Sequence, residues 1–188
     1  MFSFLKQKIK GRDVGLGFFE SVRKARIAGY PGTGELLPSS AKIGVEEVKN
    51  EWLYLDVFTV DYVVFLALGQ SPEKTAVLTP FWEEIKKWLQ QERVGALPER
   101  FSFLGGNDKT IHAENSETSF ERLTRRMQQY SDCIINPHHL GENYSVAATF
   151  AWSLCGDMKA STIAGISASF SAKKVELVKG LKLYRVVV

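Results

Sequence analysis

The sequence predicts an all-α fold, a single-domain bundle of five or six helices around a buried central helix at about residues 40–68. Apolar side chains recur at helical spacing in several separate segments. One of these segments is apolar on nearly every side, as expected for a helix at the centre of a bundle. The composition is 45% hydrophobic and 24% charged over 188 residues, which is typical of a soluble domain with a sizeable core. We therefore expect residues 1–188 to form one helical domain.

The first twelve residues alternate apolar side chains with Lys6, Lys8, Lys10 and Arg12. They lack the uninterrupted apolar run of a secretory signal, and we interpret residues 1–12 as a basic terminus that could be flexible. The two cysteines have no metal-binding or disulfide-framework spacing. Both features predict a cytoplasmic protein with reduced thiols.

A first helix is expected over residues 13–28, with glycines weakening its start, before a loop rich in Gly, Pro and Ser. The central helix at 40–68 would be capped by Ser39 or Ser40 and ended by Gly69. From residue 52 to residue 68, fourteen of seventeen side chains are apolar or aromatic. This run is shorter than the ~20 residues that a membrane span requires, and it contains two aspartates. We therefore predict a buried helix and no transmembrane segment.

The next helix, at 72–94, should run antiparallel to the central helix because the link between them is short. Pro80 would either kink this helix or restart it with Thr79 as the cap. Residues 95–117 look irregular and are expected to form a loop. His112 and Glu114 in this loop are one candidate site, in addition to the group at residues 133–142 described below.

Thr118 and Glu121 predict a capping box for a helix that continues to about residue 134. A following helix would open at Asn136-Pro137 and end near Gly156, with Trp152 in its apolar stripe. After residue 157, the spacing fits a helix to about residue 179. Residues 166–171 also alternate like a strand, and residues 178–181 could form a hairpin turn. The sequence therefore leaves open whether the C-terminal segment is helical or β.

The sequence contains one group of metal-ligand and acid–base residue types, Cys133, His138, His139 and Glu142. If Pro137 opens a helix, one histidine would share a face with Glu142. The partial positive charge of a helix N-terminus favours neutral imidazole, which can act as a base or a ligand. These four residues are the candidate metal site, and His138, His139 and Glu142 are the candidate ligand-binding residues. The spacing identifies no cofactor.

Asp56 and Asp61 interrupt the apolar run of the central helix. Burying a carboxylate is costly unless it is paired or protonated. Five positions apart on a helix, the two side chains point about 140° from each other and cannot form one carboxylate pair. Each is expected to meet an arginine (Arg122, Arg125 or Arg126) or to cap a neighbouring element, with contact to a ligand as the alternative.

The charge is unevenly distributed, because both ends of the chain are basic and the middle is acidic. The net charge is +5 for residues 1–30, −5 for 31–92 and +4 for 157–188. The chain lacks the motifs of nucleotide-binding loops, zinc proteases, esterase-type hydrolases and calcium-binding loops. It also lacks a recognisable nucleic-acid-binding signature, so we do not expect nucleic acid as a partner.

These observations favour a non-catalytic module that binds a protein partner or associates with itself. The four Trp, twelve Phe and six Tyr could furnish an interface as well as a core. The alternative is a metal-dependent or small-ligand enzyme that uses His138, His139 and Glu142. A third hypothesis is binding of polyanions or of a membrane surface through the basic termini, with Phe2, Phe4, Leu5 and Ile9 inserted.

Overall fold

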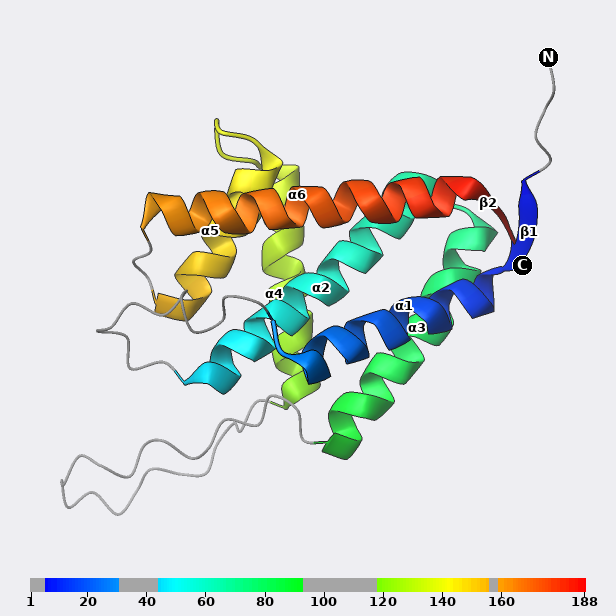
Figure 1. Ribbon diagram of the computed structural model, residues 1–188, viewed down its shortest axis with the longest axis horizontal. Coiled ribbons are helices and arrows are strands. Elements are labelled where there is room, and N and C mark those ends of the chain that lie inside the picture. The colour runs from blue at the N-terminus through cyan, green and yellow to red at the C-terminus, as the bar shows by residue number, and fades with distance from the viewer. Residues whose placement is uncertain (1–5, 31–43, 93–117, 156–158) are drawn as a thin grey trace.

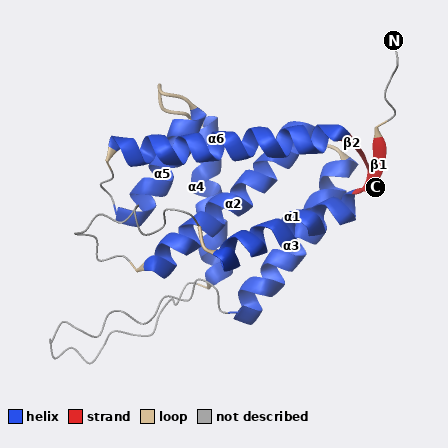
Figure 2. Ribbon diagram, viewed as in Figure 1, coloured by secondary structure: helices blue, strands red, loops and turns tan. Residues whose placement is uncertain are grey.

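A computed structural model describes residues 6–30, 44–92, 118–155 and 159–188, and these form an all-α bundle with a small parallel sheet (Figures 1 and 2). The predicted fold class is confirmed. The elements in chain order are β1 (Gln7–Lys10), α1 (Gly11–Ala28), α2 (Val45–Leu68), α3 (Pro72–Glu92), α4 (Ser119–Ile135), α5 (Glu142–Cys155), α6 (Ala160–Leu183) and β2 (Tyr184–Val187).

Helix α2 is the predicted central helix and crosses the middle of the bundle, with α1 and α3 on one side and α6 on the other (Figure 1). It contacts each of the other five helices, so its apolar side chains are buried in almost every direction. The buried apolar side chains of α2 are Val48, Leu53, Tyr54, Leu55, Val57, Phe58, Val60, Val63 and Val64. Because α2 meets another helix on nearly every side along its middle, its sequence has no polar stripe there.

The ends of α2 differ in how well they were predicted. The helix stops at Gly69, as expected, where φ is +62°, a conformation that glycine adopts readily. The prediction of Ser39 or Ser40 as the cap was wrong. The N-cap is Gly44, whose backbone N–H donates to the Glu47 carboxylate over 2.8 Å. Ser39 and Ser40 themselves lie outside the described residues.

Helices α1 and α3 approach each other closely because α1 carries glycine at the contact. A Cβ atom at Gly11 would lie 2.6 Å from the Ala76 side chain, and one at Gly15 would lie 2.2 Å from the Val77 carbonyl oxygen. Gly15 was expected only to weaken the start of this helix. Its role is instead to let the two backbones meet.

Three further boundaries can be compared with the predictions. Helix α3 continues through Pro80 without restarting. Helix α4 has the predicted capping box, in which Thr118 Oγ1 accepts from the Glu121 N–H and the Glu121 carboxylate accepts from the Thr118 N–H. Helix α5 begins at Glu142, five residues after Pro137, so the prediction that Pro137 opens a helix was wrong.

The C-terminal segment is helical to Leu183 and then forms β2. The suggested hairpin at residues 178–181 was wrong, since these residues continue α6. Strand β2 pairs with β1 in parallel, with Gln7 opposite Tyr184 and Lys10 opposite Val187. The basic N-terminal segment is therefore a strand at residues 7–10, and it lies beside the C-terminus (Figure 1).

Within the described ranges, none of the helices combines the length and the apolar character that crossing a bilayer would require.

Candidate functional site

Helix α2 makes a side-chain hydrogen bond or ion pair to each of the other five helices. These contacts lie at three levels along α2, at residues 50–51, at residue 56 and at residues 61–62. The pairs, in chain order along α2, are Asn50 with Arg26, Glu51 with Arg126, Asp56 with Lys173, Asp61 with Trp82 and Tyr62 with Glu142.

Glu51 forms the most buried of these contacts, and the sequence did not single it out. Only 4% of the residue is exposed. Its carboxylate accepts from Arg126 Nε over 3.1 Å and from the Tyr130 hydroxyl over 2.7 Å. Burial raises the pKa of the Glu51 carboxyl above its ordinary value, although Arg126 and Tyr130 oppose this shift. Glu51 stands directly before the apolar run, and that position was the only available signal.

Asp56 is also 4% exposed, and it forms an ion pair with Lys173 of α6. An arginine was expected as the partner of Asp56, but Arg126 instead forms an ion pair with Glu51. Burial raises the pKa of the Asp56 carboxyl, and Lys173 and Tyr30 partly offset the shift. Burial and, after it, the nearby Asp56 carboxylate raise the pKa of the Tyr30 phenol. The Asp56–Lys173 ion pair links α2 to α6.

Asp61 is half-buried and accepts a hydrogen bond from Trp82 Nε1 over 3.0 Å. It thus contacts α3, whereas Asp56 contacts α6, so the two aspartates do point to different neighbours. Both carboxylates are engaged by other helices of the bundle.

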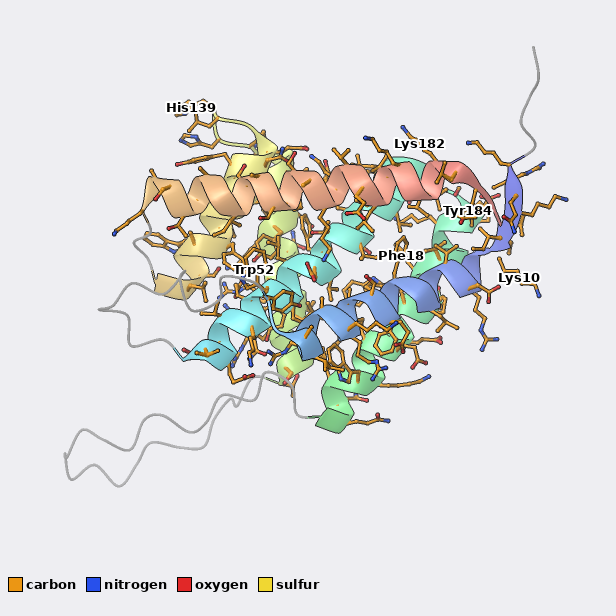
Figure 3. All side chains as sticks on the ribbon, viewed as in Figure 1. Lys10, Phe18, Trp52, His139, Lys182 and Tyr184 are labelled. Carbon is orange, nitrogen blue, oxygen red and sulfur yellow. The ribbon has the colours of Figure 1, made fainter. Side chains whose placement is uncertain are left out.

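His138 and His139 lie in the exposed turn between α4 and α5. Figure 3 shows His139 at the end of the molecule away from the two termini. The ring centroids of the two histidines are 3.8 Å apart, and the His138 ring also lies 5.4 Å from that of Tyr144. The His138 N–H donates to Ser145 Oγ over 2.8 Å, which fixes the turn against the start of α5. The histidines are therefore not on one helical face with Glu142.

Glu142 faces the bundle rather than the histidines. Its carboxylate accepts from the Tyr62 hydroxyl over 2.9 Å and pairs with Lys174 of α6. Burial alone would raise the pKa of the Glu142 carboxyl, but the hydrogen bonds from Lys174 and Tyr62 hold it below its ordinary value. Burial and the same carboxylate raise the pKa of Tyr62 to about 12. Glu142 thus links α5 to α2 and α6.

Cys133 is a free thiol on α4, and its sulfur contacts Thr149 Oγ1 on α5. It does not join His138, His139 and Glu142 in one cluster. In the part of the chain that the structure describes, no three His, Cys, Asp or Glu side chains are grouped closely enough to hold a metal ion. His112 and Glu114 lie outside the described residues.

The most unusual surface feature is Trp152 on α5, which is 74% exposed. Its neighbours Ala147 and Ala151 are buried, as the apolar stripe predicted, but the prediction that Trp152 belongs to that stripe was wrong. Tryptophan is highly buried on average in folded proteins. Trp152 lines an open groove of about 470 Å³ between α4 and α5, together with Gln129, Asp132, Ala148, Thr149 and Ser153.

The described residues thus define an all-α protein with a central helix held by buried polar contacts and an exposed tryptophan over a groove between two outer helices. No protein-family model, curated protein or solved structure matches this chain.

Proposed function

We propose that this protein is a non-catalytic self-association module, in which two copies meet through the α4–α5 face that Trp152 and its groove define. The exposure of Trp152 is the observation that carries the proposal. Tryptophan is enriched at protein interfaces and among the residues that dominate their binding free energy.

The chemistry of α5 supports a protein partner over a charged ligand. After Glu142, the helix sequence to Cys155 contains no charged residue. Depletion of charge is typical of the central part of an interface. A small polar substrate would require convergent charged or hydrogen-bonding groups. In this groove the Asp132 carboxylate already accepts from Gln128, and the Gln129 side chain accepts from Arg126. The rest of the floor consists of the small side chains of Ala148, Thr149 and Ser153.

A second copy is the occupant that fits this geometry most simply. Trp152 lines the groove and is largely exposed, so a two-fold axis at this face would place each Trp152 against the partner's groove. Because the contact is reciprocal, one patch supplies both halves of the interface. We place this association in the cytoplasm, consistent with the free thiol of Cys133.

Sedimentation equilibrium over a range of protein concentrations tests the proposal. We expect the wild type to form a dimer and Trp152→Ala to shift the equilibrium to monomer, with a loss of about 2 kcal/mol or more, as for a central interface aromatic. Ile27→Ala is the matched control, because Ile27 is 66% exposed on α1, outside the groove. A wild type that stays monomeric at high concentration, or an equal effect of Ile27→Ala, would contradict the proposal.

The alternative of an enzyme built on His138, His139 and Glu142 gains no supporting contact. The two imidazole rings lie 3.8 Å apart and tilted relative to each other in an exposed turn, while Glu142 is engaged by Tyr62 and Lys174. Replacing both histidines with alanine should therefore leave dimerisation unchanged.

A further inference from the structure

Both ends of the described chain meet at the β1–β2 end of the molecule, and this end is strongly basic. Figure 3 shows Lys10, Lys182 and Tyr184 together there, away from His139. We call this surface the terminal ribbon, and its exposed cations are Lys6, Lys8, Lys10, Arg12, Lys182 and Arg185. Apart from Asp13, residues 6–13 and 179–188 contain no acidic residue. Two basic segments far apart in the sequence thus form one positive surface.

The register of the two strands places like charges opposite each other. Ile9 lies opposite Val186, and both face the core, which leaves Lys8 opposite Arg185 on the outer face. Like charges at directly opposed positions destabilise a strand pair. Among the described residues, none of the terminal-ribbon cations takes part in an ion pair. An anionic surface laid against this face would relieve the repulsion that the fold itself leaves uncompensated.

Exposed apolar side chains stand beside these cations. Leu183 is 70% exposed, Val188 is 82% exposed and Tyr184 is 40% exposed. They flank or belong to β2, within a few residues of Lys182 and Arg185. Cations interspersed with exposed aliphatic and aromatic side chains are typical of surfaces that rest on the boundary between lipid headgroups and acyl chains.

We propose that the terminal ribbon binds the surface of a membrane rich in anionic phospholipids, with the cations against the phosphates and Leu183 and Val188 in the acyl boundary. A nucleic acid would match the charge, but it offers no apolar phase for two exposed aliphatic side chains. Of the N-terminal side chains expected to insert, Ile9 instead packs against the core. Phe2, Phe4 and Leu5 lie outside the described residues.

Co-sedimentation with vesicles tests this site. The full chain is expected to bind vesicles of phosphatidylcholine and phosphatidylserine in equal parts, but not vesicles of phosphatidylcholine alone, and added salt should weaken the binding. Each Lys or Arg near an anionic leaflet contributes about a fivefold gain in affinity. The pair Lys8→Gln/Arg185→Gln should therefore bind the anionic vesicles roughly twenty-five-fold more weakly. Its thermal midpoint should not fall, because the substitution removes a repulsion.

The matched control is Lys24→Gln/Lys159→Gln, which removes two exposed cations at the far ends of α1 and α6 and should bind as the wild type does. The variant Leu183→Ser distinguishes binding to a lipid surface from binding to other polyanions, because it should weaken vesicle binding and leave retention on heparin unchanged. Three outcomes would overturn the proposal: no binding to the anionic vesicles, an equal loss in the control pair, or vesicle binding that is insensitive to Leu183→Ser. Since none of these residues lines the Trp152 groove, failure here leaves the self-association proposal standing.

Discussion

The contact of α1 with α3 and the contact of α2 with α4 hold the bundle together in opposite ways. In the first contact, Gly11 and Gly15 of α1 carry no side chain, so the backbone of α1 can pack directly against Ala76 and Val77 of α3. In the second, Glu51 and Arg126 place charges in the interior and join them through an ion pair and the Tyr130 hydroxyl. The first contact depends on shape and the second on charge.

The difference explains how one central helix can be apolar on all sides and still have a defined rotation and register. Apolar packing tolerates many arrangements of similar volume. A buried carboxylate tolerates few arrangements, because leaving it unpaired costs several kcal/mol of folding free energy. On this view, the polar contacts of α2 specify the arrangement, while the apolar side chains and the glycines provide the close packing.

The largest effect is expected from breaking the charged contact on one side. Arg126→Ala leaves the Glu51 carboxylate buried without its cation and should lower the free energy of unfolding by about 3 kcal/mol. Urea denaturation measures this loss. Arg12→Ala is the control, because Arg12 is exposed and makes no ion pair among the described residues, and it should cost less than about 0.5 kcal/mol. Adding Glu51→Gln to Arg126→Ala should restore part of the lost free energy of unfolding. Equal losses in Arg126→Ala and Arg12→Ala would show that the buried Glu51 carboxylate does not depend on Arg126.

A smaller effect is expected from filling the glycine contact. Gly15→Ala places a methyl group 2.2 Å from the Val77 carbonyl oxygen, and the helices must separate to accept it, at a cost of about 2 kcal/mol. Gly17, two residues further along α1, faces open space. Gly17→Ala should therefore stabilise the protein by about 0.5–1 kcal/mol. Thermal melts of the two variants should move in opposite directions, and a neutral Gly15→Ala would mean that the α1–α3 distance is not fixed by this residue.

The smallest expected effect is the contribution of Asp56 to the pH dependence of stability. Its pKa is raised in the folded state, so the folded protein binds this proton more tightly than the unfolded chain. The resulting stabilisation is present at low pH and is lost as the pH rises from about 4, the ordinary pKa of aspartate, through the raised value.

Asp56→Asn removes this titration. The stability of the variant relative to the wild type should therefore increase as the pH rises from about 4, and denaturation at a series of pH values checks it. All other groups are common to both proteins and cancel in the difference. A difference that is flat, or that falls with pH, would show that Lys173 compensates fully for the burial of Asp56.

The candidate functional residues were predicted unevenly, for identifiable reasons. Asp56 is buried as expected and Asp61 is half-buried. The sequence could not name their partners, because Lys173 and Trp82 come from distant segments. Pro137 suggested a helix start, yet the Ser145 side chain accepts from the His138 N–H and stabilises a turn there instead. Trp152 has the spacing of a buried residue, but 74% of it is exposed.

The sequence by itself determined the first five helical segments and the central place of α2, because helical periodicity and all-round hydrophobicity are local properties of the chain. It left the C-terminal segment, now α6 and β2, open between helix and β. The capping box at Thr118 and the stop at Gly69 are local as well. Only the tertiary structure decided which charges meet, which glycines touch a neighbour, that the two ends of the chain pair in parallel and that Trp152 faces outward. Each of these depends on contacts between residues that are distant in sequence, and such contacts arise only once the helices pack.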